Sequence, residues 1–224
     1  MRLLSGFLLA ALIGIPAFAQ KNAEARLNAA TEDLKEMMTA SDKGIPQDLL
    51  NKASCIVIVP NLKAGGFIGG AQYGRGFFTC RRENGVGWHA PGSIKLTGGK
   101  FGLLIGVKET DVIMLVMNKE GMNHLLSDKF QIGGEASGAA GPVGRDSSAM
   151  TDAEMHAEIL SYSRSRGVFG GLDIGGSAVT GDEDANQELY GKAISNKEII
   201  NSKMMVPAAA KPLIHELNTL SSRK

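Results

Sequence analysis

The stretch "TGGKFGLLIG", residues 97–106, has the residue types of a phosphate-binding loop, with paired glycines directly before a lysine. Such a loop follows the pattern G-x-x-x-x-G-K-[ST] between a strand and a helix. With Gly99 and Lys100 as the G-K pair, the first glycine position holds Ile94, and Phe101 follows the lysine. The nucleotide-binding interpretation is therefore rejected, and the glycines are interpreted as architectural.

The acidic stretch "DEDANQE" has the alternating oxygen ligands of a calcium-binding loop, at Asp182, Asp184 and Asn186. An EF-hand loop also needs glycine at its sixth position and a bidentate glutamate at its twelfth. Those positions hold Gln187 and Ala193. Acidic side chains are favourable in the first turn of a helix, because its N-terminus carries a partial positive charge. We interpret the stretch as the start of a helix and expect no metal site.

The sequence contains no arrangement typical of nucleophilic or metal-assisted hydrolysis. The G-x-S-x-G pattern of hydrolases and the H-E-x-x-H pattern of zinc proteases are both absent. The four histidines are scattered along the chain, and neither cysteine is paired with a histidine in a recognisable motif. We therefore expect that the protein is not an enzyme and uses no cofactor.

Basic residues among glycines and aromatics are the remaining candidates for a binding surface. Residues 73–108 hold six Lys and Arg residues and one Glu, a local charge of +5, although the whole chain carries only +1. The near-neutral total excludes a strongly basic nucleic-acid binder. Arginine is well suited to holding phosphate, and ordinary solvated surface charge is the alternative. The candidates are Arg75, Lys95, Lys100, Arg145, Arg164 and Arg166.

The N-terminal residues 1–19 have the pattern of a secretory signal. Arg2 precedes an apolar run, and "AFA" at residues 17–19 matches a small-residue cleavage site. The run is shorter than the about 20 residues of a membrane-spanning helix. We expect cleavage after Ala19 and an exported protein, periplasmic or secreted, of about 205 residues.

Two cysteines, Cys55 and Cys80, lie in strand-like segments. An even and small number of cysteines favours a disulfide in an exported protein. We predict a bridge between neighbouring strands, with two free buried thiols as the alternative.

The order of the expected elements indicates the fold. A helical segment at residues 20–48 precedes a domain at residues 49–224, which begins with a buried strand that we expect to end at Pro60. Residues 65–106 include 13 glycines among short strand-like stretches, and further helices are expected near the C-terminus. Glycine weakens a strand unless the backbone bends sharply or approaches another segment. The sequence therefore predicts an α+β fold, with a compact antiparallel β-barrel core and helices packed on its outside.

Several stretches together resemble the SYLF domain family, which is also catalogued as a yeast-type actin-binding domain. They span residues 50–200 and occur in the family's order. The stretches are "GGFIGGAQYGRGFFTCR", "GWHAPGSIKLTGGKFGLLIGVKETDVIMLVMN", "GPVGR", "AEILSYSRSRGVFGGLDIGGSAV" and "DEDANQELYG".

The resemblance implies a β-barrel core, no catalysis, and weak binding to anionic phospholipids, which are phosphoinositides in eukaryotic relatives. We therefore expect a lipid-binding module of the bacterial envelope, with the six basic residues as headgroup contacts. Some family members bind actin, but the predicted export leads us to expect no actin partner here. The alternative is a structural or protein-interaction domain with a partner protein in the envelope.

Overall fold

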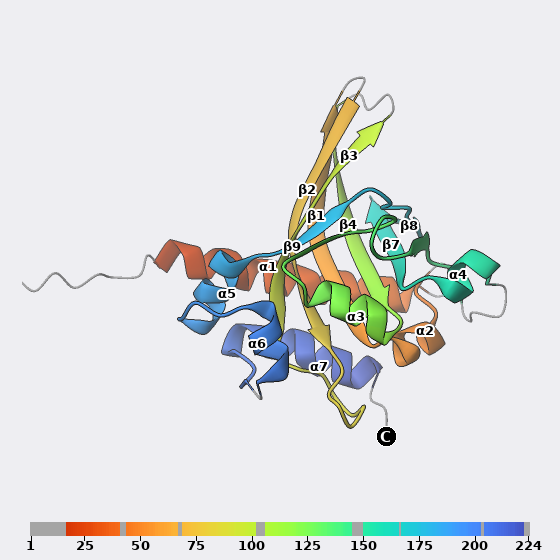
Figure 1. Cartoon of the computed structure of the whole chain (residues 1–224). Coiled ribbons are helices and arrows are strands. Elements are labelled where there is room, and N and C mark those ends of the chain that lie inside the picture. Colours follow the sequence, from red (N-terminus) through yellow and green to blue (C-terminus); the bar gives the residue numbers. More distant parts are fainter. Residues whose placement is uncertain are drawn as a thin grey trace, which may run out of the picture.

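The computed structural model describes residues 17–40, 44–66, 69–101, 106–144, 150–165, 167–202 and 204–221. Its helices surround one curled sheet (Figure 1). The helices are α1 (Ala17–Thr39), α2 (Gln47–Lys52), α3 (Lys119–Leu125), α4 (Asp152–His156), α5 (Glu183–Tyr190), α6 (Asn196–Asn201), the 3-10 helix η1 (Ala208–Ala210) and α7 (Lys211–Leu220). Within these ranges, no helix is both long enough and apolar enough to cross a membrane.

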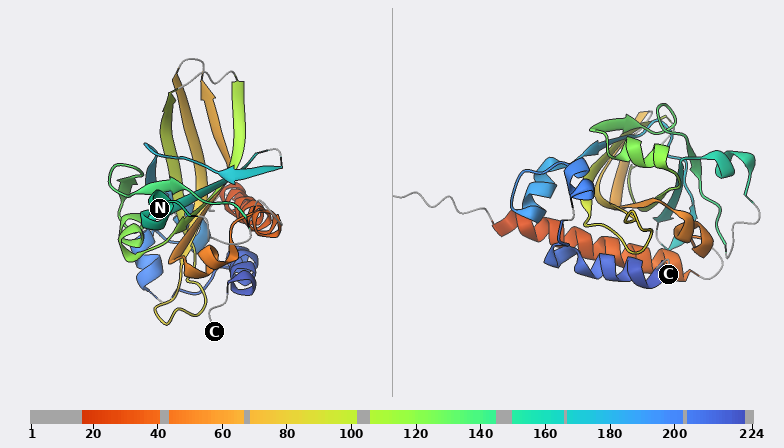
Figure 2. Two further views of the ribbon diagram at one scale, coloured as in Figure 1. Left: turned by 90° about the vertical axis from the view of Figure 1, so that its right-hand side faces the viewer. Right: turned by 60° about the horizontal axis from the view of Figure 1, so that its bottom comes forward.

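The sheet has nine strands in the order β5-β9-β3-β2-β1-β4-β7-β6, with β8 paired to β7. All pairs are antiparallel except β6 with β7. The sheet curls into a half-barrel with helices around it, which confirms the expected α+β fold class (Figure 2). The strands are β1 (Cys55–Gly66), β2 (Gly69–Cys80), β3 (Gly92–Phe101), β4 (Gly106–Val116), β5 (Lys129–Gln131), β6 (Gly138–Ala140), β7 (Ile159–Ser165), β8 (Val168–Gly171) and β9 (Ala178–Gly181).

Apolar residues alternate along the central strands, so both faces of the sheet are buried. In β1, Ile56 and Ile58 belong to the core that includes α1, α2 and α7. Val57 and Val59 point the other way, into a core that includes residues of α3 and β5. This alternation follows from the two-residue period of a strand, and it explains why the sequence of β1 reads as a continuous apolar run.

The helix α1 lies alongside α7 across the outside of the sheet (Figure 2). Its buried residues Leu27, Ala30, Leu34 and Met37 have the spacing of one helical stripe. The helical segment expected from residue 20 onward therefore contains α1, which begins within the predicted signal, at Ala17. The predicted signal residues 1–16 lie outside the described part of the chain.

The strand β1 does not end at Pro60 as expected, but continues to Gly66. Its register with both neighbours shifts around Pro60 and Asn61, and Asn61 has φ 50. Proline lacks a backbone N–H, so it is tolerated within a sheet at such a bulge. The Asn61 N–H donates instead to Asp111 Oδ1 at 3.0 Å. Proline here bends the strand rather than ending it.

Glycine faces this bulge from the neighbouring strand β2. A Cβ at Gly76 would lie 2.1 Å from the carbonyl oxygen of Ile58, and one at Gly74 would lie 2.6 Å from Val59 Cγ1. Only a residue without a side chain fits this close approach. The architectural interpretation of the glycines thus has a steric basis at these two positions.

Beyond the bulge, the four longest strands project past the helices (Figures 1 and 2). We call this projection the finger. In it, β3, β2, β1 and β4 lie side by side in that order. The finger consists of residues 61–66, 69–73, 97–101 and 106–110.

Candidate functional site

The predicted basic contacts whose side chains the structure describes, Arg75, Lys95 and Arg164, do not gather on one surface. Arg75 on β2 and Lys95 on β3 are register partners below the finger. Lys100 lies on the finger, and Arg164 lies on β7, on the other side of the sheet order. The remaining two, Arg145 and Arg166, lie outside the described residues, as does the side chain of Lys100.

Arg75 and Lys95 both bind the carboxylate of Asp182, whose side chain is fully buried. Arg75 Nε donates to Asp182 Oδ2 at 2.5 Å, and Lys95 Nζ lies 3.2 Å from Oδ1. Burial by itself would raise the pKa of Asp182, but hydrogen bonds and charge from Arg75 and Lys95 outweigh it and hold this pKa below its usual range. Asp182 is therefore a buried and negatively charged residue that binds Arg75 and Lys95 inside the fold.

The same aspartate begins α5. Its Oδ1 atom accepts from the Ala185 N–H at 3.3 Å, which is an N-cap contact. The helix ends at Gly191, which has a left-handed conformation. The acidic stretch thus has the predicted role of a helix start, and no group of acidic, His or Cys side chains suited to a metal occurs in the described part.

Arg164 forms a second ion-pair cluster, which ties α1 to the sheet. Its Nη2 atom lies 2.8 Å from Asp33 Oδ1 and 2.8 Å from Asp111 Oδ2, and its guanidinium also contacts Glu36. Asp33 is 4% exposed. Burial, together with the nearby charge of Asp111, raises the pKa of Asp33 to about 7 even though Arg164 opposes the change. The cluster joins α1, β4 and β7.

Three of the predicted headgroup contacts thus already have carboxylate partners within the fold. A lipid phosphate would have to compete with Asp182 for Arg75 and with Asp33 for Arg164. Breaking a buried pair is costly, because it leaves an uncompensated charge. Their headgroup role remains a prediction, while the structure gives each of them a role in holding elements together.

The finger carries charged and aromatic side chains that are open to solvent. Lys63 and Glu109 face each other at 3.7 Å, with side-chain exposures of 65% and 56%. Lys108 is exposed on β4, and Tyr73 on β2 is 49% exposed. Sequence reasoning missed Lys63 and Tyr73, because nothing local shows that the strands around them extend beyond the helices.

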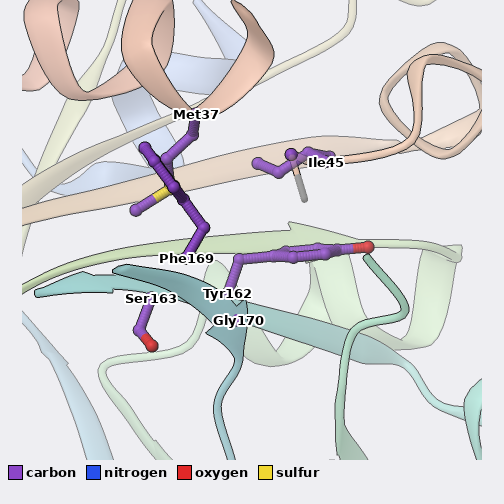
Figure 3. A pocket seen from close by; sticks show the side chains of 7 residues that line it. Met37, Ile45, Tyr162, Ser163, Phe169 and Gly170 are labelled. Atoms are coloured by element: carbon purple, nitrogen blue, oxygen red, sulfur yellow. The ribbon is translucent and has the colours of Figure 1, made fainter. Parts of the chain in front are cut away.

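Two hollows in the described structure lack a catalytic pair of side chains. The first lies between α1 and β7, where Met37, Ile45, Tyr162 and Phe169 fill the space too closely for a water molecule (Figure 3). The second has a volume of about 360 Å³ and lies beside α2 and α4, with three methionines, Met117, Met150 and Met155, in its wall. Glu154 also lines it, but its carboxylate caps α4 through Thr151. Neither hollow pairs a nucleophile with a base.

The two cysteines form a disulfide between adjacent strands. Cys55 and Cys80 are register partners in β1 and β2, and their Sγ atoms are 2.05 Å apart. The bridge lies at the end of the hairpin opposite the finger, where it joins the two central strands.

The comparisons with known proteins point to one family. The family described as Ysc84, Las17-binding protein actin regulator, matches residues 97–220. Protein YSC84 of Saccharomyces cerevisiae is 32% identical over 182 residues, which cover 80% of this chain and 38% of that protein. LAS seventeen-binding protein 3 of the same species is 31% identical over 182 residues, 80% of this chain and 39% of that protein.

The match covers a larger share of an animal relative than of the yeast proteins. SH3 domain-containing YSC84-like protein 1 of Xenopus laevis is 28% identical over 209 residues, which cover 90% of this chain and 62% of that protein. The chain therefore spans less than two thirds of the length of each of these relatives.

These names correct one expectation from the sequence. We excluded actin as a partner in favour of lipid because of the predicted export, and that exclusion is wrong: the matching family is described as an actin regulator and its yeast members by Las17 binding. The resemblance to the SYLF domain, in contrast, is confirmed. By its match over residues 97–220 and its identity to the yeast proteins, the chain belongs to the Ysc84 (SYLF) family of Las17-binding protein actin regulators.

Proposed function

We propose that this chain is a non-catalytic binding module that contacts a protein partner of the actin-regulatory kind named for its relatives. The observation that carries the proposal is the family match, which runs from β3 to α7 and so covers most of the domain. Because the chain corresponds to only part of each relative, the proposal concerns this module alone.

The described structure supports a binding role over a catalytic one. Its buried charges hold elements together: Asp182 with Arg75 and Lys95, and Arg164 with Asp33. Charges that are paired in this way contact other side chains of the protein, so we expect a partner to be contacted through the surface outside these pairs.

Co-sedimentation with actin filaments tests the proposal. A fixed amount of protein is centrifuged with increasing filament concentrations at low and at physiological salt, with serum albumin as the control for trapping. We expect saturable pelleting that weakens with salt, since the exposed finger charges are screened. A protein that stays in the supernatant at every filament concentration contradicts the proposal.

A second candidate function is weak contact with anionic phospholipid, as the resemblance implies. It is favoured by Lys63 and Lys108, which are exposed on a part of the sheet that the helices leave uncovered. Each lysine near an anionic surface contributes about 1 kcal/mol, so the contact would be peripheral and reversible. Co-sedimentation with anionic and neutral vesicles tests it, and equal binding to both kinds would contradict a headgroup contribution.

We also propose that the chain is exported and that its signal is removed after Ala19. The support is the charged, apolar and small-residue order of residues 1–19. The intact mass of the protein purified from its native cell provides the measurement. A mass that corresponds to the full sequence would contradict cleavage.

A further inference from the structure

Arg164 of β7 contacts carboxylates from two other elements. Its Nη2 atom lies 2.8 Å from Asp33 Oδ1 on α1 and 2.8 Å from Asp111 Oδ2 on β4, and its guanidinium also contacts Glu36 on α1. Since one nitrogen atom contacts both aspartates, their carboxyl groups are neighbours. Three ionised carboxylates around one guanidinium carry a net charge of −2. A proton bound to one carboxyl relieves such an excess of like charge.

The hydrogen bonds of the cluster show which oxygen atom is suited to this proton. Asp111 Oδ2 accepts from Nε and Nη2 of Arg164, at 3.1 and 2.8 Å, and Asp111 Oδ1 accepts from the Asn61 N–H at 3.0 Å. Asp33 Oδ1 accepts from Arg164 Nη2, whereas Asp33 Oδ2 is buried and has no hydrogen-bond partner. A buried carboxylate oxygen without a partner is costly, so Asp33 Oδ2 is the atom that favours protonation.

The ionisable groups around Asp33 support the same assignment. Burial is the largest influence on the pKa of Asp33 and the charge of Asp111 comes next, and together they outweigh Arg164 and hold this pKa at about 7. A hydrogen bond between the two carboxyl groups acts in the same direction as burial. Glu36 contacts the same guanidinium but is half exposed. The neighbouring strand β1 contributes the backbone N–H of Asn61, which does not titrate.

The cluster joins the sheet to the C-terminal end of α1. Residues 33–39 form about the last two turns of this helix. At its end, Met37 covers the narrow hollow that Tyr162 and Phe169 also line (Figure 3). The Tyr162 hydroxyl is buried and, like Asp33 Oδ2, has no hydrogen-bond partner. Packing of this helix end on the sheet therefore keeps two polar groups from water without giving them partners.

We propose that the proton on Asp33 is a latch: while it is bound, the last two turns of α1 stay packed on the sheet, and its loss releases them without unfolding the sheet. An ionised Asp33 places a second negative charge beside Asp111, and the single guanidinium of Arg164 cannot neutralise both. Movement of the helix end returns Asp33 to water. Leu27 and Ala30 are buried earlier in α1 and take no part in the cluster, so they keep the rest of the helix in place.

The direction of the pH dependence follows from the two states of the latch. In the closed state Asp33 keeps its proton up to about pH 7, because its pKa is raised, whereas the ordinary value is 3.8. Opening therefore releases a proton between these values, and the equilibrium constant for opening rises about tenfold for each pH unit. Above about pH 7 both states are ionised, so opening no longer depends on pH.

Amide hydrogen exchange followed by NMR tests the latch at single residues. Protection factors, corrected for the intrinsic effect of pH, are compared for residues 34–39 of α1 and for Ile56 and Ile58 of β1 from about pH 5 to 8.5. We expect lower protection in α1 than in β1, falling about tenfold per pH unit up to about pH 7 and then levelling off. Equal protection of α1 and β1 at every pH would mean that α1 opens only when the whole protein unfolds, which overturns the latch.

Three variants assign the effect to the carboxyl pair. In Asp33→Asn the side chain does not titrate, so we expect α1 protection to be independent of pH. In Asp111→Asn a neighbouring charge is lost while an amide oxygen can still accept from the Asn61 N–H, so we expect α1 protection to level off at a lower pH. Glu216→Gln is the control, because it removes a carboxylate that faces Lys35 of α1 at 3.8 Å outside the cluster, and the pH profile should stay unchanged.

The unmodified protein, labelled with ¹³C at its aspartate carboxyl carbons, locates the proton without any substitution. We expect one carboxyl resonance to titrate at about pH 7 and to be missing from the spectrum of Asp33→Asn. Ionisation of every aspartate by about pH 5 would overturn the protonated Asp33. Titration near pH 7 with α1 protection that does not change would overturn the latch. A pH profile in Asp33→Asn that matches the unmodified protein would assign the opening to another group and contradict the inference.

Discussion

At the scale of single residues, the charged side chains of this protein divide into those that hold the fold and those that face solvent. Arg75, Lys95 and Arg164 belong to the first group, because each contacts a carboxylate that is buried or nearly so. Lys63 and Lys108 belong to the second. The residue type alone does not distinguish the two groups. What distinguishes them is whether the side chain has a buried carboxylate as its partner.

Replacing Arg75 with alanine should destabilise the protein far more than replacing Lys63. Loss of Arg75 leaves the buried Asp182 with one fewer cationic partner, and breaking a buried pair costs about 3–5 kcal/mol. The Lys63–Glu109 pair is exposed, and such pairs contribute at most about 1 kcal/mol. Urea unfolding of both variants measures the difference. Equal free energies of unfolding would show that Arg75 is not a structural residue.

Asp33 should make the stability of the protein depend on pH. Its pKa is about 7 in the folded state against 3.8 for the ordinary group, so the folded state binds more protons between these values. Stability therefore falls as pH rises from about 4 to 7, and each tenfold difference in proton affinity corresponds to about 1.4 kcal/mol.

Asp33→Asn should abolish this part of the pH dependence, because an amide does not titrate. The measurement is the difference in free energy of unfolding between the two proteins at several pH values from 4.5 to 7.5. The original protein should lose stability relative to the variant as pH rises. A difference that is constant over this range contradicts the raised pKa.

At the scale of elements, local patterns in the sequence predicted the type of most segments but not their extents. The acidic stretch was correctly interpreted as a helix start, which the structure places at Asp182 before α5. The prediction that β1 ends at Pro60 was wrong, because the bulge that accommodates proline depends on the neighbouring strands. The glycine-rich stretch that follows β7 forms two separate strands, β8 and β9.

The close approach of β1 and β2 at this bulge should make Gly76 intolerant of substitution. In Gly76→Ala the added Cβ would meet the Ile58 carbonyl oxygen, which requires backbone movement and should cost about 3 kcal/mol. Gly99→Ala is the control, because the nearest atom to its added Cβ is 3.9 Å away. Thermal melts of the two variants compare them. Equal melting temperatures would contradict the steric role of Gly76.

At the scale of the whole molecule, the half-barrel is held by its core, by ion pairs across elements and by one disulfide. The bridge between Cys55 and Cys80 joins residues separated by 25 positions and connects the two central strands. The finger extends beyond the helices that surround the half-barrel (Figure 1).

Reduction of the disulfide should lower the free energy of unfolding by roughly 2–4 kcal/mol, because the closed loop restricts the unfolded chain. Guanidinium unfolding with and without reductant measures the change, with a Cys55→Ala and Cys80→Ala double variant as the control that does not respond to reductant. A free energy that is unaffected by reduction would contradict a stabilising role for the bridge.

The sequence by itself determined what depends on neighbours along the chain: the helical stripe of α1, the capped start of α5, the alternating strands and, from many such stretches together, the family. It also identified basic residues, but not which of them remain exposed. Arg75 and Asp182 are 107 positions apart, and Arg164 and Asp33 are 131 apart. Only the curled sheet brings these charges into contact and carries the finger beyond the helices, since pairing and exposure depend on distances in space that no local pattern records.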